Sequence, residues 1–86
     1  MIENFDSIIS NAKTVAISGH VRPDGDCVGS CLAMYNYIAD NFSEVCVRVF
    51  LDPIPNKFNF LTNSDKVEDI HLLSEDEVFD LYIALD

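Results

Sequence analysis

The sequence predicts an α/β fold: a mostly parallel, Rossmann-like sheet with helices packed on it. The main observation is that helix-type and strand-type patterns alternate along the chain of 86 residues, which is the order expected of such sheets. A second observation is that the strand-type runs are short and nearly all apolar, as in strands buried inside a sheet. The hydrophobic fraction of 49% is ordinary for a globular protein. A chain of this length makes one domain at most.

The first half of the chain carries the most regular patterns. Apolar side chains at helical spacing predict an amphipathic helix over residues 2–12, and the β-rich run 14–17 predicts a buried strand. From Val28 onwards apolar residues recur at i, i+3, i+4 and i+7, so a helix is expected over 28–41, with Asn41 as its stop. Few polar residues interrupt this helix, and we expect it to be largely buried.

The second half of the chain is less regular. A strand is expected at 45–51, because the run is apolar and the two prolines soon after it cannot donate to a sheet ladder. Ser74 and Glu77 match a helix capping box, which predicts a short helix. The remaining patterns predict, in order, a short helical turn at 56–61, a weak strand or connector at 66–70 and a strand at 81–85.

Asp86 comes immediately after the last predicted strand. A buried parallel strand needs cover on both faces, and no helix follows to provide it. We therefore expect residues 1–86 to be the N-terminal part of a larger domain, with a sheet that is incomplete at its C-terminus. The alternative is a terminal strand that simply ends there.

Composition limits the partners and the compartment. Fifteen acidic residues against five basic ones give a formal net charge of −10, so tight binding of duplex nucleic acid is not expected. A phosphate substrate is not excluded, because bound cations would reverse the local field. The chain shows no signal peptide and no apolar run of membrane-spanning length, and its cysteines form no disulfide pattern. We therefore expect a cytoplasmic, reduced protein without a membrane partner, in which Cys27 and Cys31 pack as small hydrophobes.

Residues 18–30 concentrate the side chains that could carry chemistry. His20, Asp24 and Asp26 follow the first predicted strand, at the end where open α/β sheets bind ligands. Imidazole and carboxylate donors suit divalent cations such as Mg²⁺ or Mn²⁺, and the glycine between the two aspartates allows them to face one centre or two. Asp86 ends another strand and would arrive at the same edge as a bridging carboxylate. Two cations about 3.5–4 Å apart would clamp a phosphoryl group for hydrolysis.

Other interpretations of this loop differ in how well they fit. An Asp-Gly-Asp sequence can also be a simple turn with an N-capping carboxylate, and that alternative stays open. An EF-hand is excluded by spacing, since the fifth and twelfth positions counted from Asp24 are Val28 and Tyr35. A dinucleotide fingerprint is excluded because G-x-G-x-x-G is absent. Arg22 either contacts a substrate phosphate or is a solvated side chain, and His71 is given no role.

Residues 20–30, His-Val-Arg-Pro-Asp-Gly-Asp-Cys-Val-Gly-Ser, resemble the first motif of the DHH phosphoesterases, H-x-x-P-D-G-D-x-x-G-S. Residues 81–86 resemble the second motif of that family, an apolar strand that ends in one aspartate. The early position of the first motif, together with residues 58–61, makes the chain most similar to the oligoribonuclease and 3′-phosphoadenosine 5′-phosphate phosphatase (nanoRNase) branch. On this resemblance, residues 1–86 are the N-terminal part of a DHH catalytic domain.

The resemblance implies a manganese-dependent enzyme that hydrolyses phosphoester bonds in short nucleotides. His20 and Asp24 would bind one Mn²⁺, Asp26 the other, and Asp86 would bridge the two, which makes Asp26 and Asp86 the catalytic residues. The sequence lacks the Asp-His-His motif that names the family, so the 86 residues alone are expected to be inactive. Cys27 stands where a small residue such as alanine is usual.

Two further hypotheses remain open. Within the same family, the chain could belong to a cyclic-dinucleotide phosphodiesterase or a single-strand exonuclease, although both usually carry additional domains before the first motif. Outside the enzyme class, it could be an acidic α/β module that forms a homodimer through its uncovered sheet.

Overall fold

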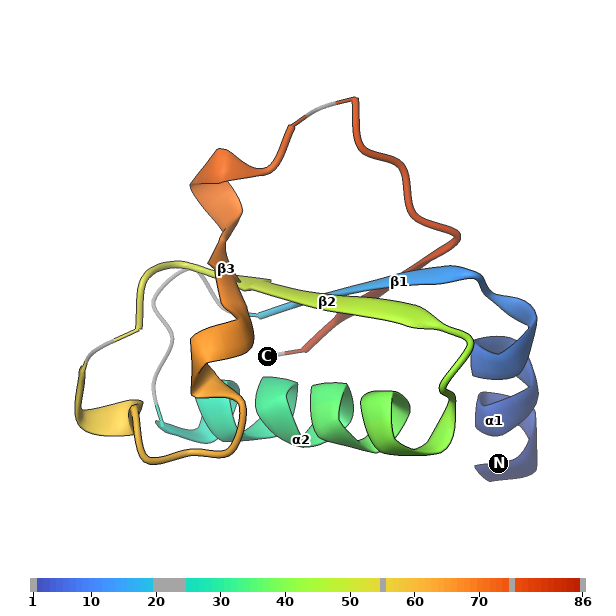
Figure 1. Cartoon of the computed structure of the whole chain (residues 1–86), viewed down its shortest axis with the longest axis horizontal. Helices are drawn as coiled ribbons and strands as arrows, with labels where there is room; N and C mark the ends of the chain where they lie inside the picture. Colours follow the sequence, from blue (N-terminus) through green and yellow to red (C-terminus); the bar gives the residue numbers. More distant parts are fainter. Residues whose placement is uncertain (1, 20–24, 55, 75, 86) are drawn as a thin grey trace.

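The computed structural model describes residues 2–19, 25–54, 56–74 and 76–85. Its centre is a four-stranded sheet in the order β3-β2-β1-β4, in which every neighbouring pair is parallel (Figure 1). The predicted parallel α/β fold is confirmed, and each strand agrees with its predicted range to within one residue at either end. The strands are β1 (Thr14–Ser18), β2 (Cys46–Leu51), β3 (Val67–Asp69) and β4 (Leu81–Ala84).

α2 (Gly25–Asn41) covers one face of the sheet, where it packs along β1 and β2 (Figure 1). It begins earlier than the predicted Val28, because the apolar pattern that defines a buried side need not extend into the first turn of a helix. The expectation that this helix is largely buried is wrong for its outer side, where Ser30, Ala33 and Asp40 are exposed. A helix that covers a sheet from outside buries only the stripe that faces the strands.

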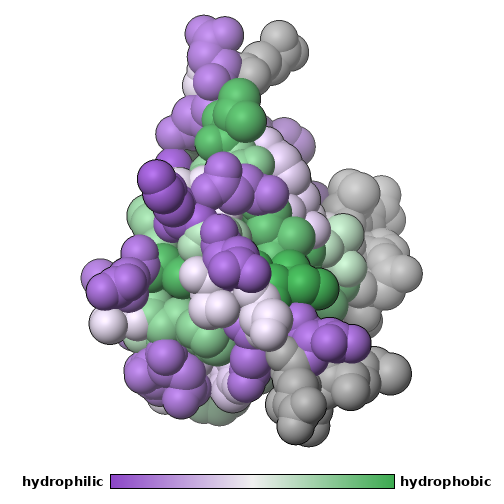
Figure 2. Space-filling view, turned by 90° about the vertical axis from the view of Figure 1, so that its right-hand side faces the viewer, coloured by the Kyte–Doolittle hydropathy of each residue, from purple (hydrophilic) through white to green (hydrophobic). Residues whose placement is uncertain are grey.

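α1 (Ile2–Asn11) lies on the same side of the sheet, beside the C-terminal end of α2 (Figure 1). The rings of Phe5 and Tyr37 are 6.2 Å apart, and the Tyr37 hydroxyl donates a 2.8 Å hydrogen bond to Asp6. At this end of the molecule polar residues cover much of the surface, with apolar residues showing between them (Figure 2). Neither α1 nor α2, nor any other helix within the described residues, is long and apolar enough to cross a membrane.

The core is divided between the two faces of the sheet, because successive strand residues point to opposite sides. Ile17 and Val49 are fully buried beneath α2, in the larger of two clusters. On the other face Phe50 packs against Phe79, with ring centroids 5.7 Å apart, in a smaller cluster. This second face is crossed by the segments 70–74 and 76–80 (Figure 1), and no α-helix of the described residues covers it.

The prediction of a helix at the Ser74 capping box is wrong for the residues that the structure describes. The Ser74 hydroxyl accepts from the backbone N–H of Asp76 (3.2 Å) and the Ser74 carbonyl from that of Glu77 (3.1 Å), which makes a turn. Tertiary contacts then hold the chain extended, since Asp80 accepts a 2.8 Å hydrogen bond from the backbone N–H of Lys13 at the start of β1. The helical turn predicted at 56–61 is present, and single 3-10 turns occur at Asn56–Phe58, Ser64–Lys66 and Ile70–Leu72.

Candidate functional site

The strand order creates a topological switch point between β1 and β4. The chain passes from β1 through α2 to β2 on one side, and later returns to β4 on the other side of β1. In open α/β sheets ligands bind in the crevice outside the carboxyl ends of the strands at such a point. The backbone N–H of Leu85 donates a 2.8 Å hydrogen bond to the carbonyl of Ser18, so these two carboxyl ends lie side by side. This is the edge at which the sequence predicts a metal site.

Gly19, directly after β1, packs against the first two turns of α2. A Cβ atom added to Gly19 would lie 2.5 Å from the sulfur of Cys27, 2.8 Å from a methyl carbon of Leu51 and 2.9 Å from the sulfur of Cys31. No side chain fits there without displacing its neighbours. Gly19 is therefore packed directly against Cys27 and Cys31 of α2.

The predicted ligands themselves lie mostly outside the described residues. His20, Arg22, Asp24 and Asp86 are not described, and Asp26 is described only through its backbone, in the first turn of α2. The structure therefore brings together Gly19, Leu85 and the start of α2, which are the neighbours of these residues along the chain. The assignment of the side chains to metal ions stays a prediction.

Sequence reasoning missed a second ionisable pair at the same edge. His71 Nε2 lies 2.5 Å from Asp52 Oδ1, and the backbone N–H of His71 donates to Asp69 at 2.9 Å. Asp52 follows β2 directly and Asp69 ends β3, so both stand at carboxyl ends of the sheet. The sequence signal that could have identified Asp52 is its position directly after an apolar strand, which is the pattern by which Asp86 was identified. Within the described ranges, no three His, Cys, Asp or Glu side chains are placed to hold a metal ion.

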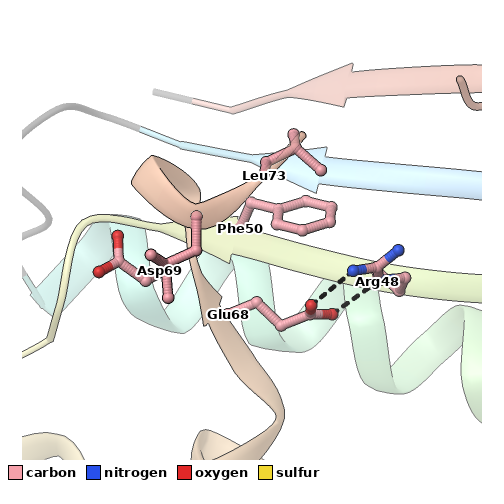
Figure 3. Close-up of a pocket in the computed structure, with 6 residues that line it drawn as sticks. Arg48, Phe50, Glu68, Asp69 and Leu73 are labelled. Carbon is pink, nitrogen blue, oxygen red and sulfur yellow. Dashed lines mark hydrogen bonds and ion pairs between the residues drawn. The ribbon is translucent and has the colours of Figure 1, made fainter. Parts of the chain in front are cut away.

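A pocket of about 240 Å³ lies on the face of the sheet away from α2 (Figure 3). Its cation, Arg48, is fully engaged: it donates to Glu68 through Nε (2.8 Å) and Nη2 (2.6 Å) and to Glu77 through Nη1 (2.9 Å). Arg48 lowers the pKa of Glu68, mainly through these hydrogen bonds. The two carboxylates carry more negative charge than the one guanidinium carries positive charge, so the pocket does not suit an anionic substrate. Its lining consists of Arg48, Phe50, Glu68, Asp69, Leu72 and Leu73.

No family model matches the chain, and no curated protein matches it. Among solved structures, the fold is similar to that of an exopolyphosphatase-related protein from Bacteroides fragilis, with a TM-score of 0.71 and 25% sequence identity. The alignment covers 81% of this chain and 20% of that protein, so the chain spans about a fifth of its length. The similarity confirms the predicted fold. It does not favour the nanoRNase branch, which stays a prediction.

Proposed function

We propose that this chain carries part of a metal-dependent phosphohydrolase site, built on residues 20–26 and Asp86. The observation that carries the proposal is that these residues directly follow β1 and β4, whose carboxyl ends are neighbours at the switch point. The similarity to an exopolyphosphatase-related protein supports hydrolysis of bonds to phosphorus as the reaction class. Because the aligned part is only 20% of that protein, we expect the 86 residues to bind metal without turnover.

His20, Asp24, Asp26 and Asp86 are the residues that would hold the metal. Their imidazole and carboxylate donors are of the kind that Mn²⁺ accepts. The backbone position of Asp26 in the first turn of α2 fits this role, because that turn packs beside the end of β1. When bound, two Mn²⁺ ions would supply Lewis-acid polarisation of the phosphoryl group. His20 and Asp24 are assigned to one ion, Asp26 to the other and Asp86 to both.

The chain's own contribution is to bind and orient the phosphate. The first backbone N–H groups of a helix have no partner within it, and the helix dipole favours an anion at that end. The start of α2 is therefore a suitable place for a phosphate oxygen, and Arg22 would add a positive charge. With a formal net charge of −10 on the chain, the carboxylates at the site must be neutralised by cations before an anionic substrate can approach.

Two substrate classes remain candidates. A short nucleotide, either an oligoribonucleotide or 3′-phosphoadenosine 5′-phosphate, is the substrate that the motif resemblance implies. Inorganic polyphosphate is the second candidate, and the exopolyphosphatase-related neighbour favours it. Both present phosphoryl groups to the same residues, so only turnover assays with both substrates separate them.

The metal assignment is tested by calorimetric titration of the 86-residue chain with Mn²⁺. Asp24→Asn removes one charge from the predicted ligand set, and we expect a loss of affinity of about tenfold or more, or about 1.4 kcal/mol. Asp40→Asn is the matched control, because it removes the same charge from the exposed side of α2, and its affinity should stay within about twofold. Equal effects of the two substitutions, or no binding by the unsubstituted chain, would sink the proposal.

Turnover is tested separately. The 86-residue chain with Mn²⁺ is expected to leave the chromogenic diester bis(p-nitrophenyl) phosphate intact, and hydrolysis by the chain would refute the idea of an incomplete site. A longer polypeptide with an Asp-His-His segment after Asp86 is expected to be active. Its rates on 3′-phosphoadenosine 5′-phosphate and on tripolyphosphate then decide between the two substrate classes.

A further inference from the structure

Thr14 and Asp80 bind each other's backbone where β1 and β4 begin. The Asp80 carboxylate accepts hydrogen bonds from the backbone N–H groups of Lys13 (2.8 Å) and Thr14 (3.3 Å), both through Oδ2. In the other direction, the Thr14 hydroxyl accepts a 2.9 Å hydrogen bond from the backbone N–H of Asp80. The carbonyl of Lys13 accepts from the backbone N–H of Cys46 at 2.9 Å, so the same point is also tied to β2. We name the three bonds made by Asp80 the Thr14–Asp80 clamp.

The apolar side chains of β4 do not by themselves fix its position along β1. Leu81, Ile83 and Leu85 are the alternate residues that pack against the larger core cluster beneath α2. All three are aliphatic and of similar size. A slip of two residues would place Ile83 and Leu85 where Leu81 and Ile83 now lie, and every side chain would stay on its own face of the sheet.

The Thr14–Asp80 clamp does distinguish these registers. Val15 lies opposite Leu81, so Thr14 and Asp80 are the next pair toward the start of the strands. A slip of two residues would move Asp80 by about 6.6 Å, and all three hydrogen bonds would be lost. Phe79 also anchors this segment, because it is buried in the smaller core cluster. The hydrogen bonds add the fixed direction and distance that an apolar contact lacks.

The register of β4 decides where the end of this strand lies. The backbone N–H of Leu85 donates to the carbonyl of Ser18 at 2.8 Å, and the predicted metal ligand Asp86 is the next residue. Asp80 comes five residues before Leu85, about 16 Å along an extended strand, so it is too distant to be a ligand itself. A shift of about 6.6 Å would withdraw a carboxylate from an ion whose bonds to oxygen are about 2 Å long.

We propose that Thr14 and Asp80 are positioning residues for the metal site. By fixing the register of β4 on β1, they hold the strand end that leads into Asp86 beside the end of β1. This inference rests on the proposed function, because the position of Asp86 matters to the site only if Asp86 binds metal. Loss of the clamp is therefore expected to weaken metal binding from the opposite end of the sheet.

Calorimetric titration of the 86-residue chain with Mn²⁺ compares two substitutions of Asp80. Asp80→Ala removes the oxygen that accepts both N–H groups, whereas Asp80→Asn keeps an oxygen there, and both remove the same charge. We expect Asp80→Ala to weaken Mn²⁺ binding by about tenfold or more and Asp80→Asn to stay within about twofold of the unsubstituted chain. Thr14→Val, which removes the hydroxyl, and Thr14→Ser, which keeps it, repeat the comparison if Asp80→Ala fails to fold.

Amide hydrogen exchange without metal reports on the strand end directly. The Leu85 N–H should exchange about tenfold or more faster in Asp80→Ala than in Asp80→Asn, because the hydrogen bond to Ser18 opens more often. Ile9→Val is the control for a general loss of stability, since Ile9 is a fully buried residue of α1. Its Mn²⁺ affinity should stay within about twofold of that of the unsubstituted chain.

The outcomes separate this inference from the proposed function. Full Mn²⁺ affinity or unchanged Leu85 exchange in a folded Asp80→Ala variant would overturn the positioning role and leave the proposed function standing. An equal loss of affinity in Asp80→Asn or in Ile9→Val would also overturn it, because charge or stability alone would then explain the effect. Absence of Mn²⁺ binding by the unsubstituted chain would overturn the proposed function, and the positioning role with it.

Discussion

The substitution Gly19→Ala tests the packing that joins the end of β1 to α2. The new methyl group would lie 2.5 Å from Cys27 Sγ, 2.8 Å from Leu51 Cδ2 and 2.9 Å from Cys31 Sγ. All three atoms belong to buried side chains, so at least one must move. Overpacking of this kind costs about 1–3 kcal/mol, and three simultaneous clashes argue for about 3 kcal/mol. That is a large share of the roughly 4–13 kcal/mol expected for a domain of this size.

Urea denaturation monitored by circular dichroism measures this cost. With a slope near 1.5 kcal/mol per molar urea, a loss of about 3 kcal/mol lowers the midpoint by about 2 M. Gly29→Ala is the matched control, because its added Cβ has no atom within 4 Å. Alanine is the better helix former, so this control should gain about 0.5–1 kcal/mol.

A double substitution identifies the atoms responsible. Cys27→Ala removes the sulfur nearest to the new methyl group, so Gly19→Ala should cost at least about 1 kcal/mol less in that background. The reasoning would be refuted if Gly19→Ala were as well tolerated as Gly29→Ala, or if its cost were unchanged without the Cys27 sulfur.

Three further results are expected. Glu68→Gln removes a carboxylate whose pKa Arg48 lowers, and it should reduce the free energy of unfolding by at most about 1 kcal/mol, because both side chains are partly exposed. This loss should be present above about pH 4.3 and vanish as the pH falls through the lowered pKa. An unchanged difference in stability between the two proteins in acid unfolding curves would contradict this. Burial raises the pKa of Cys31 to about 12. Iodoacetamide at pH 8 should therefore modify the exposed Cys46 before Cys31. Equal rates of alkylation of Cys46 and Cys31, measured by mass spectrometry, would contradict this. Tyr82 on β4 is 59% exposed. If the sheet is a homodimer interface, Tyr82→Arg should shift the sedimentation coefficient toward that of the monomer. An unsubstituted chain that sediments as a monomer at all concentrations would exclude this interface.

β1 and β2 were predictable because each is a short and mostly apolar run with buried residues, whereas β3, with two acidic residues among its three, gave only a weak strand pattern. β1 and β2 carry alternating residues that are buried on the two faces, as Ile17 and Phe50 show. Such short apolar runs are typical of strands inside a sheet. Because they alternate with helical patterns along the chain, a parallel sheet could be predicted. The helix over residues 2–12 was equally clear, because Ile9 and its neighbours at helical spacing anchor it to the core.

The failures occurred where long-range contacts override local signals. The Ser74 capping box is a genuine local motif, but Phe79 is buried against Phe50 and Asp80 binds the backbone at the start of β1. These contacts leave too little chain for a helix. The pairing of Asp52 with His71 was also beyond local reasoning, because the two residues are 19 positions apart and meet only when β2 and β3 are neighbours.

This Asp52–His71 pair provides a way to find the limits of the proposed metal site. His71→Ala removes an imidazole at the carboxyl edge, but Asp52 and His71 have no third ligand among the described residues. We therefore expect Mn²⁺ affinity to stay within about twofold, since the predicted ligands follow β1 and β4 and not β2. The His71 side chain is 70% exposed, so its contact with Asp52 should contribute less than about 1 kcal/mol to stability. Calorimetry and urea denaturation of the same sample check both values. A loss of Mn²⁺ affinity comparable to that of Asp24→Asn, without a loss of stability, would extend the metal site across β1 to the ends of β2 and β3.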